Sequence, residues 1–142
     1  MDFTDEMYIR GTLRQGTVYY IYLAEFGDWH YFVVLNRLPL DHNEIYLVYS
    51  SSKVEKVKRR IKLRKQPLGT CVEVKKEDYE PFTEDSAFDC NTIITFTRTG
   101  LEERRANGSL QICDDFPSIH LNSLCDATRL SPKATTQMRS RI

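Results

Sequence analysis

The chain has 142 residues and a mass of 16.6 kDa, the usual size of one domain with its own hydrophobic core. Its 20 basic and 20 acidic side chains cancel, which excludes a global attraction to nucleic acid or membranes and leaves only local clusters of charge. The sequence contains neither an N-terminal signal pattern nor an apolar run of roughly 20 residues, so we expect a cytoplasmic protein that does not bind membranes.

The first half of the chain is predicted to form short strands. Residues 17–23 (TVYYIYL) follow Gly16 and are mostly β-branched or aromatic. Two further apolar runs, 29–36 and 44–50, are separated by RLPLDHN, whose Pro, Asp and Asn residues are typical of a turn. In residues 60–64 (RIKLR), apolar and basic side chains alternate with the period of two that is typical of a strand, which would have a basic outer face.

Two more strands and two helices are predicted in the second half. Residues 70–74 (TCVEV) and 88–97 (FDCNTIITFT) complete a set of about six strands. Residues 115–117 (DFP) are typical of a helix start with proline in the first turn. Ser131 before Pro132 repeats this signal for a short terminal helix.

Short strands joined by short turns favour a small closed barrel or a strongly coiled sheet. No internal repeat or long linker divides the chain. We therefore predict a single, mainly β domain over residues 1–142. Its barrel would span about 10–100 and a helical extension about 101–142, with short helices after residue 114.

Cysteines and histidines are spread along the chain without metal-binding spacing. The four cysteines form no CxxC pair and lie mostly among strand-like residues, which favours buried free thiols over disulfides and makes a metal site the least favoured reading. Three dispersed histidines also make a poor metal site. We expect neither a metal nor a cofactor.

Several pieces of sequence occur in a fixed order between residues 16 and 101. They are Gly16 before TVYYIYL, His30 before YFVVL, IYLVYSSS, Thr70 before CVEV, Tyr79, Ser86 before AFDCNTIITF, and Leu101. This ordered set resembles the MazF/PemK toxins, the cytoplasmic endoribonucleases of bacterial toxin–antitoxin pairs. The resemblance implies an SH3-like barrel with helices packed at one end, commonly a symmetric homodimer with a groove for single-stranded RNA across the interface. It also implies a protein antitoxin that inhibits the enzyme by lying in that groove.

Two positions depart from the family pattern. The catalytic arginine at the head of the family's second strand falls on His30, and the proline after it is Tyr31. The family's Thr/Ser pair falls on Ser51 and Ser52. Arginine grips phosphate with a planar fork and keeps its proton near neutral pH, so histidine changes the chemistry of that position. Either imidazole carries out the proton transfer here, or catalysis is lost and a binding groove remains.

The residues themselves suggest how RNA could be cut without a metal. The reaction needs a base for the 2′-OH proton, an acid for the leaving 5′-oxygen, and donors or cations for the charge that develops on the phosphate. Imidazole titrates near neutral pH, so His30 could make either proton transfer. The Ser51 and Ser52 hydroxyls could hold a phosphate oxygen, with Lys53 supplying charge one residue on. A second set of basic residues would contact the RNA backbone from the predicted basic strand, namely Arg60, Lys62 and Arg64.

Each of these residues also has an ordinary structural interpretation. A lone histidine at a strand start is often only a partly exposed side chain, and serines at a strand end often bond to the local backbone. In residues 53–65, eight of the thirteen side chains are Lys or Arg, and such a run is usually a solvated face. Most tyrosines belong to the core or the sheet surface, although one or two could stack on bases in a groove.

The leading hypothesis is therefore a metal-independent endoribonuclease of the MazF/PemK type, with His30, Ser51 and Ser52 as its reaction centre. One alternative is a non-catalytic SH3-like module that binds nucleic acid or a partner protein through the same groove. A structural adaptor with a solubilising basic strand is the third reading.

Overall fold

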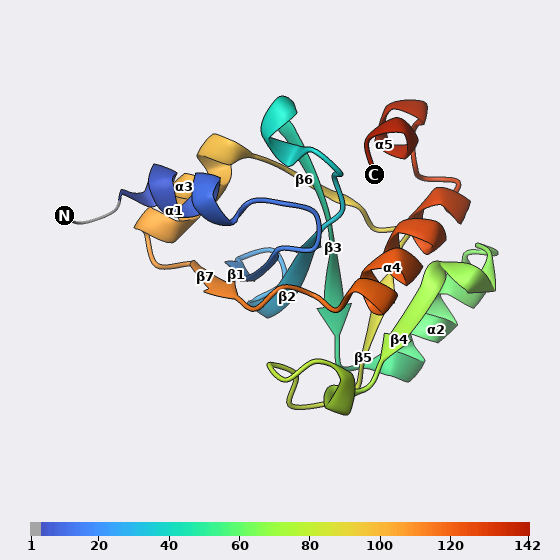
Figure 1. The fold of residues 1–142 in the computed structure, drawn as a ribbon. Helices are drawn as coiled ribbons and strands as arrows, with labels where there is room; N and C mark the ends of the chain where they lie inside the picture. The colour runs from blue at the N-terminus through green and yellow to red at the C-terminus, as the bar shows by residue number, and fades with distance from the viewer. Residues whose placement is uncertain (1–3) are drawn as a thin grey trace.

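A bent antiparallel sheet forms the centre of the computed structural model, which describes residues 4–142 (Figure 1). The strands are β1 (Val18–Leu23), β2 (Asp28–Val34), β3 (Glu44–Ser51), β4 (Cys71–Val74), β5 (Ser86–Asp89), β6 (Ile94–Thr97) and β7 (Leu110–Cys113). The α-helices are α1 (Asp5–Thr12), α2 (Val54–Leu63), α3 (Arg98–Ala106), α4 (Ser118–Leu130) and α5 (Thr136–Arg141). Short 3-10 turns lie at Pro39–Asp41, Leu68–Thr70 and Lys76–Asp78.

The strands are ordered β4-β5-β3-β2-β1-β7, and β6 also pairs with β3. β3 is the central strand because it pairs with β6 through Glu44–Leu47, with β2 through Leu47–Tyr49, and with β5 through Ser50 and Ser51. Within the described residues the outer strands β4 and β7 do not pair with each other, so the sheet is bent and remains open.

Both faces of the sheet are buried, each under its own helices (Figure 1). On one face, Ile9 of α1 and Leu101 of α3 pack with Phe32 and other inward side chains of β1, β2 and β3. On the other face, Leu124 of α4 and Phe82 of the 75–85 loop pack with residues such as Val33 and Val48. Two-sided burial explains why the three first strands are almost continuously apolar in the sequence.

Gly16 makes the tight entry into β1 that the sequence suggested. Its φ of +91° lies in the left-handed region, which favours glycine. Its N–H donates to the carbonyl of Val34 at 2.9 Å, and its own carbonyl accepts from the N–H of Phe116 at 2.8 Å. A Cβ atom at this position would lie 2.9 Å from Cδ2 of Leu121. The missing side chain therefore lets β1, the end of β2 and the start of α4 meet.

The predicted fold class is confirmed: the chain is β-rich, and α4 and α5 follow residue 114. The strands predicted at 17–23, 29–36, 44–50 and 70–74 correspond to β1 to β4. The single strand predicted over 88–97 is two strands, β5 and β6, because the chain turns between them. Of the two sheet forms considered, the coiled open sheet is the one observed.

The strand predicted over residues 60–64 is wrong, because this segment belongs to helix α2. The alternation of Ile61 and Leu63 misled the prediction: Ile61 is fully buried, whereas Leu63 is 75% exposed. The buried apolar side chains of this segment follow the period of a helix, since Val54, Val57 and Ile61 lie on one side of it and pack near Ala87. The basic outer strand face therefore does not exist.

Three elements were not predicted: α1, α3 and β7. Helix α1 buries only Ile9 and α3 buries only Leu101, so neither has a strong apolar stripe. β7 has four residues and pairs with β1, so the sheet includes a strand that follows residue 101 in the sequence. None of the helices between residues 4 and 142 has the length and hydropathy to span a membrane.

Candidate functional site

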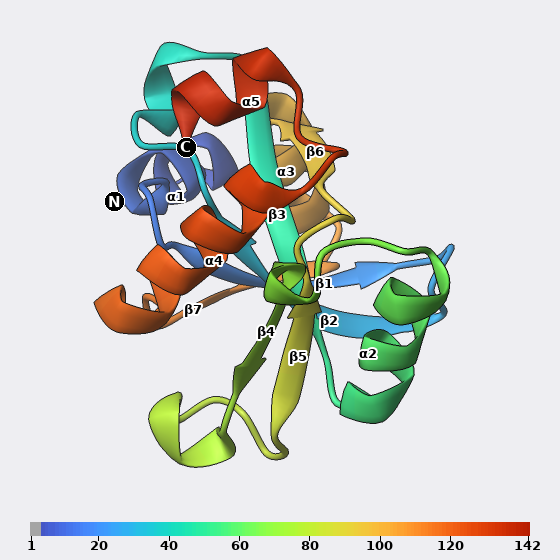
Figure 2. The same cartoon turned by 90° about the vertical axis from the view of Figure 1, so that its right-hand side faces the viewer.

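β2 and β3 separate at one end of the sheet, and a cavity opens where they part. Their pairing ends at Phe32 and Tyr49, after which β3 pairs with β5 through Ser50 and Ser51. The β1–β2 hairpin and the β4–β5 pair leave the centre of the sheet in different directions (Figure 2). Within the described residues, the first half of β2 therefore pairs with β1 alone. The cavity beside this free edge has a volume of about 310 Å³.

The cavity brings together the residues that the sequence singled out on two separate strands. His30 comes from β2, Ser51 from the end of β3, and Ser52 and Lys53 from the link to α2. His30 and Ser51 are half-buried, whereas Ser52 and Lys53 are exposed. The predicted catalytic residues and one predicted backbone contact thus line a single concavity.

The His30 ring is held in place by one hydrogen bond and two aromatic neighbours. Its Nδ1 lies 2.7 Å from the carbonyl oxygen of Ser50. A carbonyl only accepts, so Nδ1 carries the hydrogen, and in the neutral ring Nε2 then has a free lone pair. The ring also makes edge contacts with Phe26 and Tyr49, at centroid distances of 5.5 Å and 5.3 Å. Among the described residues no side chain or carbonyl is bonded to Nε2, so that atom is available to a ligand.

Tyr49 is the neighbour of His30 on β3, and its burial raises the pKa of its phenol above the ordinary value. Arg60 opposes this rise by a smaller electrostatic effect. The phenol therefore stays neutral at physiological pH and adds no charge beside the imidazole.

The link between β3 and α2 offers a hydroxyl group and backbone N–H groups to the cavity. The Ser51 hydroxyl accepts a hydrogen bond from the N–H of Lys53 at 3.2 Å, which is the local backbone role expected of a serine at a strand end. Within the described chain, the Ser52 hydroxyl has no such bond. Helix α2 begins directly afterwards at Val54, and Lys53 at its N-cap position makes no side-chain capping bond. The first N–H groups of the helix therefore lie next to these side chains.

A further part of the cavity wall comes from the 75–85 loop. The Tyr31 hydroxyl donates to the carbonyl of Pro81 at 2.9 Å and so ties β2 to this loop. Phe82, Thr83 and Glu84 then face the cavity. Ser86 also lines it, but its hydroxyl donates to the Glu84 carbonyl at 3.2 Å, which is the structural role that serines before strands commonly take.

Sequence reasoning did not single out two carboxylates of this cavity, Asp28 and Glu84. Nothing distinguishes them in the sequence, because acidic side chains are frequent in the turn after β1 and in the 75–85 loop. Among the described lining residues Lys53 is the one permanent cation, and no arginine is present. The cavity is therefore polar but not basic.

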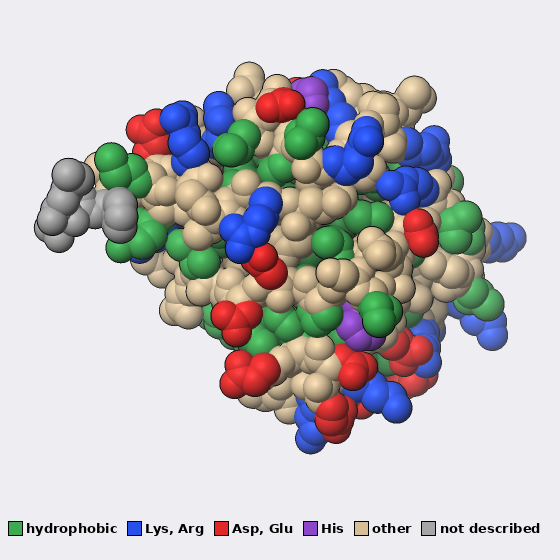
Figure 3. Space-filling view, in the orientation of Figure 1, with side chains coloured by type: hydrophobic (Ala, Val, Ile, Leu, Met, Phe, Trp, Pro, Cys, Tyr) green, Lys and Arg blue, Asp and Glu red, His purple; other side chains and the backbone are tan. Residues whose placement is uncertain are grey.

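The other predicted RNA contacts do not reach this cavity. Arg60 donates to the Asp89 carboxylate through Nε and one terminal nitrogen, at 3.2 Å and 3.1 Å. Lys62 lines a separate cavity of about 470 Å³ between α2 and β4, and Arg64 lines a third beside Lys133. Basic side chains gather mainly at the upper right of the molecule and acidic ones at its lower edge, over the 75–85 loop (Figure 3). The structure thus separates these three basic residues instead of placing them in one row.

The Arg60–Asp89 pair belongs to a buried polar network. The side chain of Asp89 is only 3% exposed, and it also accepts hydrogen bonds from Asn91 and Thr92. Asn91 in turn donates to Thr70 and accepts from Ser131 of the α4–α5 link. These bonds satisfy the polar groups at the break between β5 and β6, as expected for a structural role.

The four cysteines are free thiols, two buried and two half-buried. Burial raises the pKa of Cys90 to about 12. Within residues 4–142 the His, Cys, Asp and Glu side chains form no group of three that could hold a metal ion.

The open, bent sheet with helices on both faces and a polar cavity at a strand separation defines a small β-rich fold with one candidate site. No protein-family model and no curated protein matches the sequence. Among solved structures, an endoribonuclease in complex with its cognate antitoxin from Mycobacterial species has a similar fold, with a TM-score of 0.52. The match covers 82% of this chain and 90% of that chain at 13% sequence identity. The chain therefore shares the fold of that endoribonuclease, which confirms the resemblance at the level of the fold.

Proposed function

We propose that this protein is an endoribonuclease of the MazF/PemK type that cuts single-stranded RNA through its 2′-OH. The observation that carries the proposal is the convergence of His30, Ser51, Ser52 and Lys53 on one cavity, with Nε2 of His30 available. The shared fold with an endoribonuclease supports the same reaction class.

The tautomer of His30 favours a role as the base. With Nδ1–H donated to the Ser50 carbonyl, Nε2 takes the proton of a 2′-OH. The 2′-oxygen then attacks the adjacent phosphorus atom, and the bond from phosphorus to the 5′-oxygen breaks. The 5′-oxygen takes a proton from a water molecule at the open side of the cavity, and the hydroxide that remains takes the proton from Nε2, which returns His30 to its neutral form. The products are a 2′,3′-cyclic phosphate and a 5′-hydroxyl end.

Phosphate binding is assigned to the link before α2. The Ser52 hydroxyl, the Lys53 ammonium group and the first N–H groups of the helix provide donors and positive charge for the non-bridging oxygens. Asp28 and Glu84 also line the cavity and repel a phosphate, so the Lys53 ammonium group and the hydrogen-bond donors of this link have to offset their charge. Arg60, Lys62 and Arg64 have no part in this proposal because they lie outside the cavity.

A protein antitoxin and a homodimer are part of the same proposal. The structural neighbour was solved with its cognate antitoxin, and the resemblance implies a groove shared by two subunits. Induced expression of the protein should arrest growth, and co-expression of a small acidic protein encoded next to it should restore growth. Growth arrest that such a partner leaves unchanged would count against the antitoxin.

A non-catalytic module that binds nucleic acid is the second candidate, and a specific observation favours it. No arginine is found among the described residues that line the cavity, although arginine is the catalytic residue that the resemblance leads one to expect. Such a module would retain RNA in a salt-sensitive way and leave it intact.

The experiment incubates the purified protein with single-stranded RNA of mixed sequence in the presence of EDTA. The proposal predicts cleavage fragments that end in a 2′,3′-cyclic phosphate, and no cleavage of DNA of the same sequence, which lacks the 2′-OH. RNA that stays intact but is retained by the protein at low salt would overturn the proposed endoribonuclease activity and support the binding module. Fragments with 3′-hydroxyl ends would overturn the 2′-OH mechanism.

A further inference from the structure

A row of aromatic rings runs across the β1–β2 hairpin next to the cavity. The order of the rings is Tyr31, Tyr20, Trp29 and Tyr22, with neighbouring centroids 4.4 Å, 5.2 Å and 5.9 Å apart. The register pairs Tyr20 with Tyr31 and Tyr22 with Trp29 across the two strands. The Tyr20 and Trp29 rings are stacked, with an angle of 23° between their planes.

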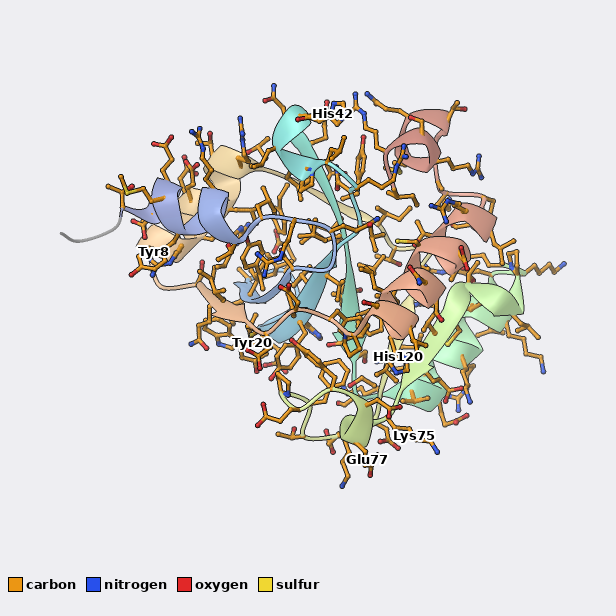
Figure 4. All side chains as sticks on the ribbon, viewed as in Figure 1. Tyr8, Tyr20, His42, Lys75, Glu77 and His120 are labelled. Carbon is orange, nitrogen blue, oxygen red and sulfur yellow. The ribbon has the colours of Figure 1, made fainter. Side chains whose placement is uncertain are left out.

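The row passes from the core to the surface. At its inner end the Tyr31 ring packs against Phe82, at a centroid distance of 5.2 Å. Tyr20 and Trp29 are half-buried, and Tyr22 at the outer end is 37% exposed. Tyr20 lies at the same end of the molecule as Lys75 and Glu77 of the 75–85 loop (Figure 4). The middle of the row therefore presents aromatic surface to solvent at the end of the molecule that holds the cavity.

Three of the four rings line the cavity, namely Tyr31, Tyr20 and Trp29, and Tyr22 does not. Trp29 and Tyr31 flank His30 in the sequence of β2, so their side chains point to the opposite face of the strand from the imidazole. The cavity includes residues from both faces because it lies at the free edge of β2. A nucleotide at this edge has the imidazole on one side of the strand and the aromatic row on the other.

Charge alone does not attract a polyanion to this cavity, since the carboxylates of Asp28 and Glu84 line it together with Lys53. Proteins that bind single-stranded nucleic acid combine phosphate contacts with aromatic rings on which bases stack, and the stacking tolerates any base. We propose that the Tyr20–Trp29 pair is a stacking subsite for one unpaired base of a single-stranded RNA whose phosphate lies beside His30. This inference rests on the proposed function and specifies how its substrate is held.

Trp29 is the only tryptophan of the chain, so its fluorescence reports directly on this subsite. The probe is a short oligonucleotide of 2′-O-methyl RNA, which has no 2′-OH and cannot be cleaved by the proposed route. Its comparison is an oligonucleotide of equal length whose nucleotides are abasic, which has the same phosphates and no bases. The inference predicts that the first probe quenches Trp29 and binds about 5-fold to 100-fold more tightly than the abasic one. Equal affinity and equal quenching would overturn it.

Two matched variants locate the effect. Tyr20→Leu removes a ring that lines the cavity, and Tyr22→Leu removes the ring of the same row that lies outside it. Tyr20→Leu should weaken the binding of the 2′-O-methyl RNA by about 5-fold to 100-fold and leave the affinity for the abasic probe unchanged. Tyr22→Leu should change neither affinity. An equal loss in both variants would show that the hairpin, and not the subsite, is responsible. The comparison of the two probes on the unmodified protein does not depend on how either variant folds.

Cleavage assays separate this inference from the proposed function. If the protein cuts RNA but binds both probes equally, the stacking subsite is wrong and the endoribonuclease stands. If the bases quench Trp29 and tighten binding while RNA stays intact, the endoribonuclease is wrong and the subsite stands.

Discussion

The Nδ1 atom of His30 lies 2.7 Å from the carbonyl oxygen of Ser50, which connects β2 and β3 just beyond the point where their pairing ends. This bond has two consequences. It orients the imidazole at the edge of the cavity, and it leaves Nε2 as the nitrogen that can exchange a proton with a ligand. The neighbouring residue, Ser51, begins the segment that we assign to phosphate binding.

Removing the hydroxyl of Ser52 should slow RNA cleavage. If this group donates to a non-bridging oxygen in the transition state, Ser52→Ala should lower the single-turnover rate by about 10-fold to 100-fold, which is less than for a fully buried donor because Ser52 is exposed. Ser140→Ala on α5 is the matched control, since among residues 4–142 that hydroxyl bonds only to the local Gln137 carbonyl. Equal rates for all three proteins would remove Ser52 from the reaction centre.

Replacing Arg60 should affect stability and leave RNA binding unchanged. Arg60→Met leaves the Asp89 carboxylate buried without its cation, which should lower the free energy of unfolding by about 1 to 3 kcal/mol. Arg59→Met, in the exposed neighbouring position, should change it by less than about 0.5 kcal/mol. Urea unfolding measures both. A loss of RNA affinity without a loss of stability would instead restore Arg60 as an RNA contact.

A methyl group at Gly16 should destabilise the fold more than one at Gly27. Both glycines have positive φ, +91° and +67°, so alanine is strained at either position. At Gly16 the new Cβ also meets Leu121 at 2.9 Å, whereas nothing lies within 4 Å of it at Gly27. We expect Gly16→Ala to lower the free energy of unfolding by about 1 to 3 kcal/mol and Gly27→Ala by about 1 kcal/mol. Equal losses would mean that the contact with α4 is unimportant.

Stability should fall at alkaline pH. Burial raises the pKa of Tyr19 from the ordinary value of 10.0 to about 12, and that of Cys90 from 9.0 to about 12. The unfolded chain therefore releases these protons first, so the stabilisation is complete below about pH 9 and is lost as the pH rises towards 12.

Tyr19→Phe tests this pH dependence. The variant loses the hydrogen bond between the hydroxyls of Tyr19 and Thr12, which should cost about 1 kcal/mol at pH 7. Between pH 10 and 12 the free energy of unfolding should fall with pH less steeply for Tyr19→Phe than for the unmodified protein. The two slopes should differ by about 1.4 kcal/mol per pH unit. Parallel curves for the two proteins would contradict the assignment.

The β-rich fold could be predicted because its first strands carry strong local signals. Residues 17–23 and 29–36 are apolar and β-branched on both faces, and the glycine before β1 has the positive φ that its turn requires. Helix α2 was missed because the alternation of Ile61 and Leu63 with basic residues imitated a strand. The spacing of Val54, Val57 and Ile61 is helical and could have identified α2 from the sequence, and the packing of these residues with Ala87 confirms it.

The candidate site was only partly predictable. His30 lies near the start of β2, and Ser51 and Ser52 lie at and just after the end of β3. Consecutive antiparallel strands bring such ends to the same side of a sheet, so their proximity could be expected from the sequence, although β2 and β3 do not pair there. Glu84 lies in the 75–85 loop and Asp28 is the first residue of β2, and the sequence does not indicate that these two positions meet at one cavity. The aromatic row likewise depends on which tyrosines share a face with Trp29, which the β1–β2 register decides.

The rate of RNA cleavage by His30→Ala tests the central claim most directly. Without the proposed base, the single-turnover rate on mixed-sequence single-stranded RNA should fall by about 10² to 10⁴ relative to the unmodified protein. His42→Ala is the control, because His42 lies at the opposite end of the molecule from Tyr20 and the cavity (Figure 4), and it should cleave at the unmodified rate. Cleavage by folded His30→Ala at the unmodified rate would contradict the account.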